Sequence, residues 1–282
     1  MQLSAAAQAM QATLHGKDGG FRGCSTDSRT LPSGALFFAL RGEQFDGHGF
    51  IAEATRRGAS AAVVEREMKD PGLPLLAVPD TRQALGRLAG VWRQCFPVSM
   101  VAVTGSNGKT TVKEMLAAIF SPLAPTLVPP GNFNNDIGVP LTLFGLGHEH
   151  RFGVIEMGAN HAGEIAALTR LVQPQVAVIT QCAPAHLEGF GSIEGVACAK
   201  AEIYAGLGAG GTAVINADDT YAEYWRSACA GRRQISFGLR PGAEVTAARV
   251  EVSGNGMNFV LAHRERECCV RLQLLGAHNV AN

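Results

Sequence analysis

The sequence has few charged residues and no excess of either sign. Charged side chains make up 17% of the 282 residues, and 24 basic residues balance 24 acidic ones. An average globular domain has roughly 25% charged residues. Proteins that bind DNA or RNA usually carry a basic excess, because phosphate neutralisation dominates their affinity. We therefore expect no nucleic-acid partner, while the 46% hydrophobic content provides for sizeable buried cores.

The chain also lacks the marks of a secreted or membrane-spanning protein. Residues 1–14 have neither the basic segment nor the continuous apolar segment of a signal peptide. No apolar run approaches the roughly 18 residues of a transmembrane helix. The seven cysteines contain no Cys-x-x-Cys pair, which disfavours a disulfide framework and a zinc site. We expect a cytoplasmic protein without a membrane span.

Glycine, by contrast, is abundant, and the length predicts two domains. Glycine occupies 34 of 282 positions, about 12% against roughly 7% on average, so we expect loops in which backbone approaches a ligand. Residues 1–80 predict a small α/β domain. Residues 81–282 alternate strands and helices up to Gln234–Phe237, and an antiparallel meander follows. This pattern predicts an α/β fold whose second domain has a mostly parallel sheet covered on both faces.

The clearest motif is a glycine-rich turn between a strand and a helix. Val98–Val103 predicts a buried strand, and the segment Thr104–Thr111 has the compact form Gly-x-x-Gly-Lys-Thr. Glycines let backbone N–H groups close around phosphate oxygens, and the helix N-terminus adds positive potential. Lys109 is suited to bridging the β- and γ-phosphates and the Thr110 hydroxyl to binding Mg²⁺. The nucleotide-binding residues predicted here are Thr104, Gly105, Ser106, Asn107, Gly108, Lys109, Thr110 and Thr111.

An acidic residue that completes the metal site is expected on a neighbouring strand. Glu156 ends the apolar run Phe152–Glu156, and ligands of open α/β sheets bind at the carboxyl ends of the strands. On the local sequence alone, a solvent-exposed glutamate at a strand end remains an equal alternative.

Six motifs in this order resemble the Mur ligases of peptidoglycan precursor synthesis. They are Thr104–Thr111, Gly131–Pro140, Glu156–Asn160, His186–Gly191, Ala199–Ile203 and Gly276–Asn282. Within the family the resemblance is strongest to the MurF type, because of Glu156–Asn160 and the run Asn132–Asn135. The N-terminal motifs Thr26–Arg29, Gly34–Leu40 and Asp46–His48 extend the resemblance over the whole chain.

The resemblance implies an ATP-dependent ligase. Such an enzyme phosphorylates the carboxylate of a UDP-N-acetylmuramoyl-tripeptide and then joins it to D-alanyl-D-alanine, releasing ADP and phosphate. Charge gathers on phosphoryl and acyl oxygens, so catalysis should rest on cations and positioning. This agrees with the sequence, in which we find no Ser-His-Asp or Cys-His arrangement.

The resemblance also implies the metal-binding and catalytic residues. Thr110 and Glu156 would hold one Mg²⁺ and His186 and Lys200 a second, with Lys109, Lys200 and His186 as catalytic residues. A protonated lysine cannot bind a metal, but the matching lysine of the family carries a CO₂-derived carbamate. Composition alone would favour a helix-surface lysine at position 200.

Substrate contacts are implied at three further places. Asn134 and Asn135 would contact the muramoyl peptide, and Ser28 and Arg29 of the first domain the uridine diphosphate. Asparagines in a turn, and a turn at Thr26–Arg29, are the structural alternatives. The adenine would be faced by Asn279 and Asn282.

The family has a third, C-terminal ligase domain, and this sequence ends where the central domain finishes. We therefore expect a fragment that binds the UDP substrate and part of ATP without completing ligation. We also expect a monomer. Two other functions stay open: another Mur-type ligase, such as the MurE type or a folylpolyglutamate ligase, and a non-catalytic nucleotide-binding protein. The MurE type should lack Gly158–Asn160 and the folate type the UDP-binding domain. A non-catalytic protein gives no reason for His186 and Lys200 to accompany the phosphate loop.

Overall fold

The computed structural model describes residues 1–42, 45–66, 68 and 71–282, which form two compact units. Unit 1 comprises Met1–Pro97 and Asp136–His148, and unit 2 comprises Val98–Asn135 and Glu149–Asn282. The chain therefore leaves unit 1, begins unit 2, and returns to unit 1 for one short segment.

Unit 1 is built on a small, mostly parallel sheet with the strand order β1-β5-β4-β3-β2. Its strands are β1 (Thr13–His15), β2 (Cys24–Ser25), β3 (Leu36–Phe38), β4 (Ala61–Val64) and β5 (Leu75–Ala77). Only β1 runs antiparallel to its neighbour among these described strands. Strands β3 and β4 are completely buried, which explains why they occur in the sequence as continuous apolar runs.

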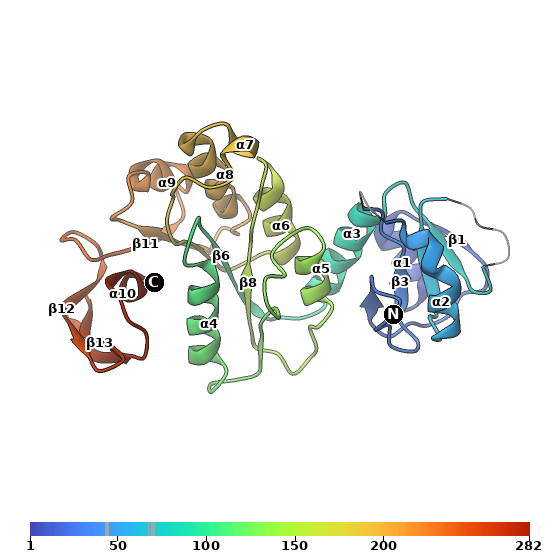
Figure 1. Cartoon of the computed structure of the whole chain (residues 1–282), viewed down its shortest axis with the longest axis horizontal. Helices are drawn as coiled ribbons and strands as arrows, with labels where there is room; N and C mark the ends of the chain where they lie inside the picture. The colour runs from blue at the N-terminus through green and yellow to red at the C-terminus, as the bar shows by residue number, and fades with distance from the viewer. Residues whose placement is uncertain (43–44, 67, 69–70) are drawn as a thin grey trace. The chain divides into compact units, whose positions relative to one another are not determined.

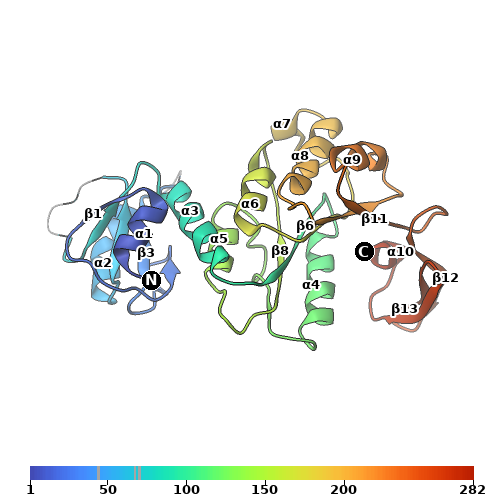
Figure 2. The same cartoon turned by 180° about the vertical axis from the view of Figure 1, so that it is seen from behind.

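The helices of unit 1 pack on this sheet. They are α1 (Leu3–Met10), α2 (Ile51–Arg56), α3 (Thr81–Gln94) and α5 (Gly138–Leu143), with a 3₁₀ turn at Gly47–Phe50. Helix α3 begins where the Asp80 carboxylate accepts a hydrogen bond from the Gln83 N–H, a side-chain N-cap. It lies beside α5 in both views (Figures 1 and 2).

The compact units divide the chain differently from the predicted boundary near residue 80. A boundary at residue 80 places the helix that follows it in the second domain. In the structure its buried face, with Ala84, Leu85 and Leu88, belongs to the same core as Leu3 and Met10 of α1. Since this apolar face is covered by unit 1, the division falls after Pro97 instead.

Unit 2 contains the larger sheet, with the strand order β14-β13-β12-β11-β10-β9-β6-β8-β7. Its strands are β6 (Ser99–Thr104), β7 (Thr126–Leu127), β8 (Phe152–Glu156), β9 (Val176–Ile179), β10 (Thr212–Asn216), β11 (Arg233–Gly238), β12 (Val245–Ser253), β13 (Gly256–His263) and β14 (Arg266–Leu272). The pairs from β7 to β12 are parallel, whereas β12, β13 and β14 form an antiparallel meander. The α/β class, the parallel sheet and the meander are thus as predicted.

Helices cover both faces of the parallel part of this sheet. The helices of unit 2 are α4 (Lys109–Phe120), α6 (Glu164–Val172), α7 (Leu187–Phe190), α8 (Ile193–Ala205), α9 (Ala222–Ala228) and α10 (Ala277–Ala281). Val101 and Val103 of β6 pack with Val112 of α4 in one apolar cluster. Helices α4 and α6 lie on opposite sides of β8 in both views (Figures 1 and 2). Among the described residues, no helix combines the length and apolarity needed to cross a bilayer.

Candidate active site

The phosphate loop lies between β6 and α4, where the sequence predicts it. Two glycines give the loop its shape: Gly105 has φ +153° and Gly108 has φ +80°. A Cβ atom on Gly105 would lie 1.8 Å from the Thr180 Oγ1 atom, so this position also needs glycine for space. Helix α4 begins at Lys109 with a glycine N-cap and no side-chain cap in the described chain, which leaves its first turn suited to an anion.

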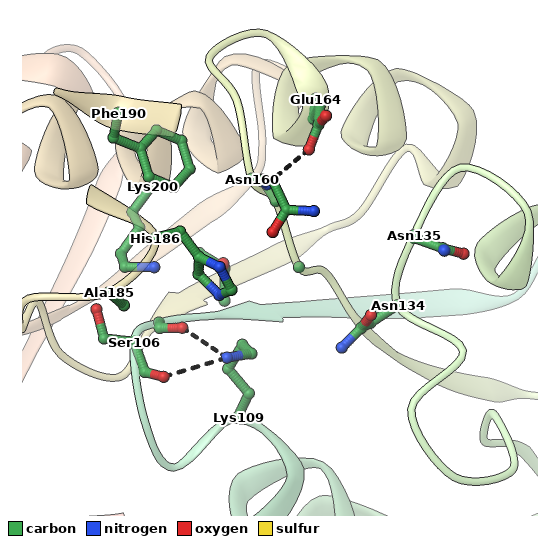
Figure 3. Close-up of a pocket in the computed structure, with 14 residues that line it drawn as sticks. Ser106, Lys109, Asn134, Asn135, Asn160, Glu164, Ala185, His186, Phe190 and Lys200 are labelled. Atoms are coloured by element: carbon green, nitrogen blue, oxygen red, sulfur yellow. Dashed lines mark hydrogen bonds between the residues drawn. The ribbon is translucent and has the colours of Figure 1, made fainter. Parts of the chain in front are cut away.

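The Lys109 ammonium group lies inside this loop. Its Nζ atom donates hydrogen bonds to the carbonyl oxygens of Gly105 (2.8 Å) and Ser106 (3.3 Å) (Figure 3). Burial lowers the pKa of Lys109, while the nearby Glu156 carboxylate acts in the opposite direction. The loop therefore presents a positive charge at the carboxyl end of β6.

Glu156 occupies the predicted position at the end of β8, and it is buried, with 2% of its surface exposed. Its Oε2 atom accepts a hydrogen bond from the Thr110 hydroxyl at 2.8 Å, and its Oε1 atom accepts one from the Asn134 amide at 2.8 Å. The structure thus brings the two predicted ligands of the first metal together. It also places the amide of Asn134 on the same carboxylate, a contact that no sequence motif predicts.

Ser106 joins the phosphate loop to the loop that follows β9. Its backbone N–H donates to the Gln181 carbonyl at 2.9 Å and its hydroxyl to the Ala183 carbonyl at 2.8 Å. The Ala183 N–H donates back to the same hydroxyl at 3.0 Å. The sequence predicts that Ser106 binds the nucleotide. In the structure its hydroxyl and its N–H form hydrogen bonds between the two loops.

Thr180 makes a second connection between these loops. Its hydroxyl donates to the Asn107 carbonyl at 2.5 Å. On the other side, the Cys182 N–H donates to the Asp219 carboxylate at 2.7 Å. The loop after β9, which leads to His186, is therefore fixed at several points.

Lys200 lies on α8 and is buried, with 7% of its surface exposed. Burial is the largest cause that lowers its pKa to about 8, and the positive charge of Lys109 adds to it. Within the described chain, its ammonium has no hydrogen-bond or ion-pair partner. This lysine therefore differs from the surface lysine that composition alone favoured.

His186 precedes α7 on an exposed, left-handed backbone position with φ +51°. Left-handed conformations are uncommon for residues other than glycine and often occur at functional sites. The side chains of Lys109, His186 and Lys200 lie on one side of the pocket, and those of Asn134 and Asn135 lie on the other (Figure 3). The pocket therefore has the side-chain nitrogen groups of two lysines and a histidine on one side and two side-chain amides on the other.

These groups line a pocket of about 260 Å³ in unit 2. The lining residues are Thr104, Gly105, Ser106, Lys109, Asn134, Asn135, Gly158, Ala159, Asn160, Glu164, Ala185, His186, Phe190 and Lys200. Thr110 and Thr111 line a neighbouring apolar groove on α4 together with Leu274.

The remaining predicted residues lie outside this pocket. The side chain of Asn282 lies against Gly108, where a Cβ atom would be 2.4 Å from its Oδ1 atom, and the Asn279 amide donates to the Leu275 carbonyl at 2.8 Å. Ser28 belongs to unit 1 and donates to Glu53 Oε2 at 3.1 Å.

Arg29 also belongs to unit 1 and makes a two-pronged contact with Asp27. Its Nε and Nη2 atoms donate to the two carboxylate oxygens of Asp27 at 2.9 and 2.8 Å. These bonds lower the pKa of Asp27 to about 2. The contact agrees with a turn at Thr26–Arg29, and the UDP-binding role of Ser28 and Arg29 stays a prediction.

Sequence reasoning missed several residues that shape the site. Thr180 backs the phosphate loop, and Glu164 accepts a hydrogen bond from the Asn160 N–H at 2.8 Å. Lys113 is completely buried below the loop that carries Asn134. Thr180 follows directly after β9, so its position at a strand end was the one available signal. Nothing local marks Lys113, which looks like any charged residue of a surface helix.

Comparison with known families matches both parts of the chain. Residues 103–282 match the Mur ligase middle domain, and residues 21–93 match the Mur ligase family catalytic domain. The chain is 45% identical over 281 residues to the UDP-N-acetylmuramoyl-tripeptide–D-alanyl-D-alanine ligase of Escherichia coli K12, covering 99% of this chain and 62% of that enzyme. The chain thus spans about three fifths of the length of this relative.

Solved structures of MurF proteins also superpose on this chain. A crystal structure of MurF from Acinetobacter baumannii superposes with a TM-score of 0.92 at 40% identity, covering 99% of this chain and 62% of that one. MurF ligase from Thermotoga maritima in complex with ADP superposes with a TM-score of 0.81 at 29% identity, covering 92% and 61%.

Proposed function

Because the chain belongs to the Mur ligase family, we propose that its pocket serves an ATP-dependent ligase that joins D-alanyl-D-alanine to UDP-N-acetylmuramoyl-tripeptide. The single observation that carries this proposal is the convergence of Lys109, His186 and Lys200 on one pocket beside the Thr110–Glu156 pair. The relatives named for this reaction, and the ADP complex of one of them, support the choice of substrates.

Two side chains, Thr110 in the first turn of α4 and Glu156 at the end of β8, fit Mg²⁺. Thr110 offers a hydroxyl oxygen and Glu156 a carboxylate, and both are the hard oxygen ligands that Mg²⁺ prefers. The two side chains are already in contact at 2.8 Å, so little reorganisation is needed to bind one ion. When bound, Mg²⁺ supplies positive charge that offsets the negative charge of the phosphate oxygens during transfer.

The chain's own groups bind and orient the reacting parts. The first turn of α4 and the Lys109 ammonium bind the phosphates, which places the γ-phosphoryl group in the pocket. A carboxylate oxygen of the muramoyl peptide takes this group, giving an acyl phosphate and ADP. The amine of D-alanyl-D-alanine then attacks the acyl carbon, and phosphate leaves as the amide forms. We infer that Asn134 and Asn135, which lie on the other side of the pocket, orient the muramoyl peptide.

Lys200 is proposed to act as a carbamate. Its buried amine with a pKa of about 8 is neutral far more often than an ordinary lysine at neutral pH. A neutral amine combines with CO₂ to form a carbamate and releases one proton. The product offers two anionic oxygens, which with His186 suit a second Mg²⁺. ¹³C NMR of protein equilibrated with ¹³C-bicarbonate tests this: a carbamate signal is expected in wild type and not in Lys200→Ala.

Binding measurements on the 282-residue chain test the proposed function. Isothermal titration should detect both Mg·ATP and UDP-N-acetylmuramoyl-tripeptide, and Lys109→Ala should lose the first while keeping the second. Binding of ATP without binding of the muramoyl peptide would favour a non-catalytic nucleotide-binding protein. Absence of both would reject the proposal.

A further inference from the structure

Lys113 carries a buried charge that the proposed reaction does not use. It lies on α4, and its side chain has no exposed surface. Its Nζ atom donates to the carbonyl oxygens of Gly131 (2.9 Å) and Pro129 (3.4 Å) and lies 3.0 Å from Glu114 Oε1. An ammonium group has three donors, and here each has an acceptor. A buried cation is costly unless it is fully paired, so this arrangement ties the loop at Pro129–Gly131 to α4.

The other end of this loop reaches the catalytic pocket. The Asn134 carbonyl accepts a hydrogen bond from the Gly158 N–H at 2.8 Å, and the Asn134 amide donates to Glu156 Oε1 at 2.8 Å. A Cβ atom on Gly158 would lie 3.1 Å from the Asn134 amide, so the loop approaches the backbone closely there. Asn135 lines the same pocket.

The loop is therefore held at one end by Lys113 of α4 and at the other by Glu156 and Gly158 at the end of β8. Glu156, which accepts from Asn134, also accepts from the Thr110 hydroxyl. Thr110 and Lys113 are three residues apart on α4 and so lie on one face of it. The contacts therefore run from Lys113 through the loop to Asn134. They continue from Asn134 to Glu156 and from Glu156 back to Thr110 on α4.

We propose that Lys113 is a positioning residue that holds loop 129–135 in place, so that Asn134 and Asn135 face the pocket and the muramoyl-peptide substrate binds. It acts through the loop and does not touch substrate. The identity of that substrate rests on the proposed function, whereas the anchoring of the loop does not.

Hydrogen exchange followed by mass spectrometry tests the anchoring directly in the 282-residue chain. In Lys113→Met, the amides of Asn134 and Gly158, which donate backbone hydrogen bonds at this loop, should exchange about tenfold faster than in wild type, while β6 and β9 stay protected. Glu114→Gln is the matched control, because it removes the neighbouring charge and leaves both carbonyl contacts; its loop should exchange as in wild type. Loop exchange in Lys113→Met equal to wild type would overturn the proposal.

Binding separates this inference from the proposed function. In Lys113→Met, the Kd for UDP-N-acetylmuramoyl-tripeptide should rise about tenfold and the Kd for Mg·ATP should stay within about twofold. Lys113→Arg, which keeps the charge, should recover part of the loss. If wild type does not bind the muramoyl peptide, the proposed function fails while the exchange result still stands. If circular dichroism shows that Lys113→Met does not fold, Lys113→Leu takes its place, because its side chain is shorter and has no hydrogen-bond donor; wild-type loop exchange there would also overturn the proposal.

Discussion

The Thr110 hydroxyl donates a hydrogen bond to the Glu156 carboxylate at 2.8 Å, joining the first turn of α4 to the end of β8. Two oxygen groups from separate strand–helix connections thus meet beside the phosphate loop. This pair is the structural basis of the proposed Mg²⁺ site.

Thr110→Val should weaken nucleotide binding only when magnesium is present. The substitution keeps the shape of the side chain and removes the hydroxyl oxygen, so the Kd for Mg·ATP should rise by about 10- to 100-fold. Titration of ADP in EDTA is the control, and there wild type and variant should agree. Equal affinities for Mg·ATP would show that Thr110 does not hold the metal.

Lys200→Met should stabilise the chain at neutral pH, by an amount that falls as the pH rises. The folded-state pKa of Lys200 is about 8 against 10.5 for the free side chain, so folding is penalised while the amine is charged. Between these two values the unfolded chain binds more protons, and wild type gains stability with increasing pH. The advantage of the variant is on the order of 3 kcal/mol at pH 7 and should vanish by about pH 10.5.

Urea unfolding of both proteins at pH 7 and pH 10, in bicarbonate-free buffer with EDTA, measures this difference. A stability difference that is the same at both pH values would mean that burial does not depress the Lys200 pKa. Lys113 can be compared with Lys200, because it is also a buried lysine but its ammonium group has three acceptors.

Gly105→Ala should damage the phosphate loop more than Gly108→Ala. Both positions have positive φ, but the new Cβ at residue 105 meets the Thr180 hydroxyl, whereas at residue 108 it meets the amide end of the Asn282 side chain. The Asn282 side chain can turn aside, while Thr180 is buried and bonded to the Asn107 carbonyl. Thermal unfolding should therefore show the larger loss for Gly105→Ala, and a reversed order would contradict this account.

Ser106→Ala should disturb the His186 loop and leave phosphate binding nearly intact. The hydroxyl exchanges two hydrogen bonds with Ala183, and their loss should cost about 1–2 kcal/mol of stability. Hydrogen exchange at residues 181–186 should speed up, while the Kd for ATP changes by less than about threefold. A large loss of ATP affinity with unchanged exchange would instead assign the hydroxyl to the nucleotide.

The sequence predicted features that depend on local pattern. The presence of α4 directly after a glycine-rich turn and the bounds of β8, a short apolar run, both agree with the structure. The positions of Lys109 and Glu156 at the carboxyl ends of parallel strands follow from the strand order rule.

Features that depend on contacts between distant segments were not predicted. Helix α3 joins unit 1 because of a core shared with α1, and residues 136–148 return to unit 1 after the phosphate loop. The burial of Lys113 and the bonds between Ser106 and Ala183 likewise join segments that are far apart in the chain. Sequence periodicity does not reveal these pairings, because a polar residue that bonds to a distant segment follows the same pattern as a polar residue exposed to solvent.

Trapping of the acyl phosphate shows whether this chain transfers the γ-phosphoryl group of ATP to the muramoyl peptide. The 282-residue chain is incubated with Mg·ATP, UDP-N-acetylmuramoyl-tripeptide and hydroxylamine, which converts an acyl phosphate to a stable hydroxamate, and the product is identified by mass spectrometry. The account predicts a hydroxamate of the muramoyl peptide with an equal amount of ADP, both lost in Lys109→Ala. Binding of both ligands without ADP or hydroxamate above the Lys109→Ala background would contradict it.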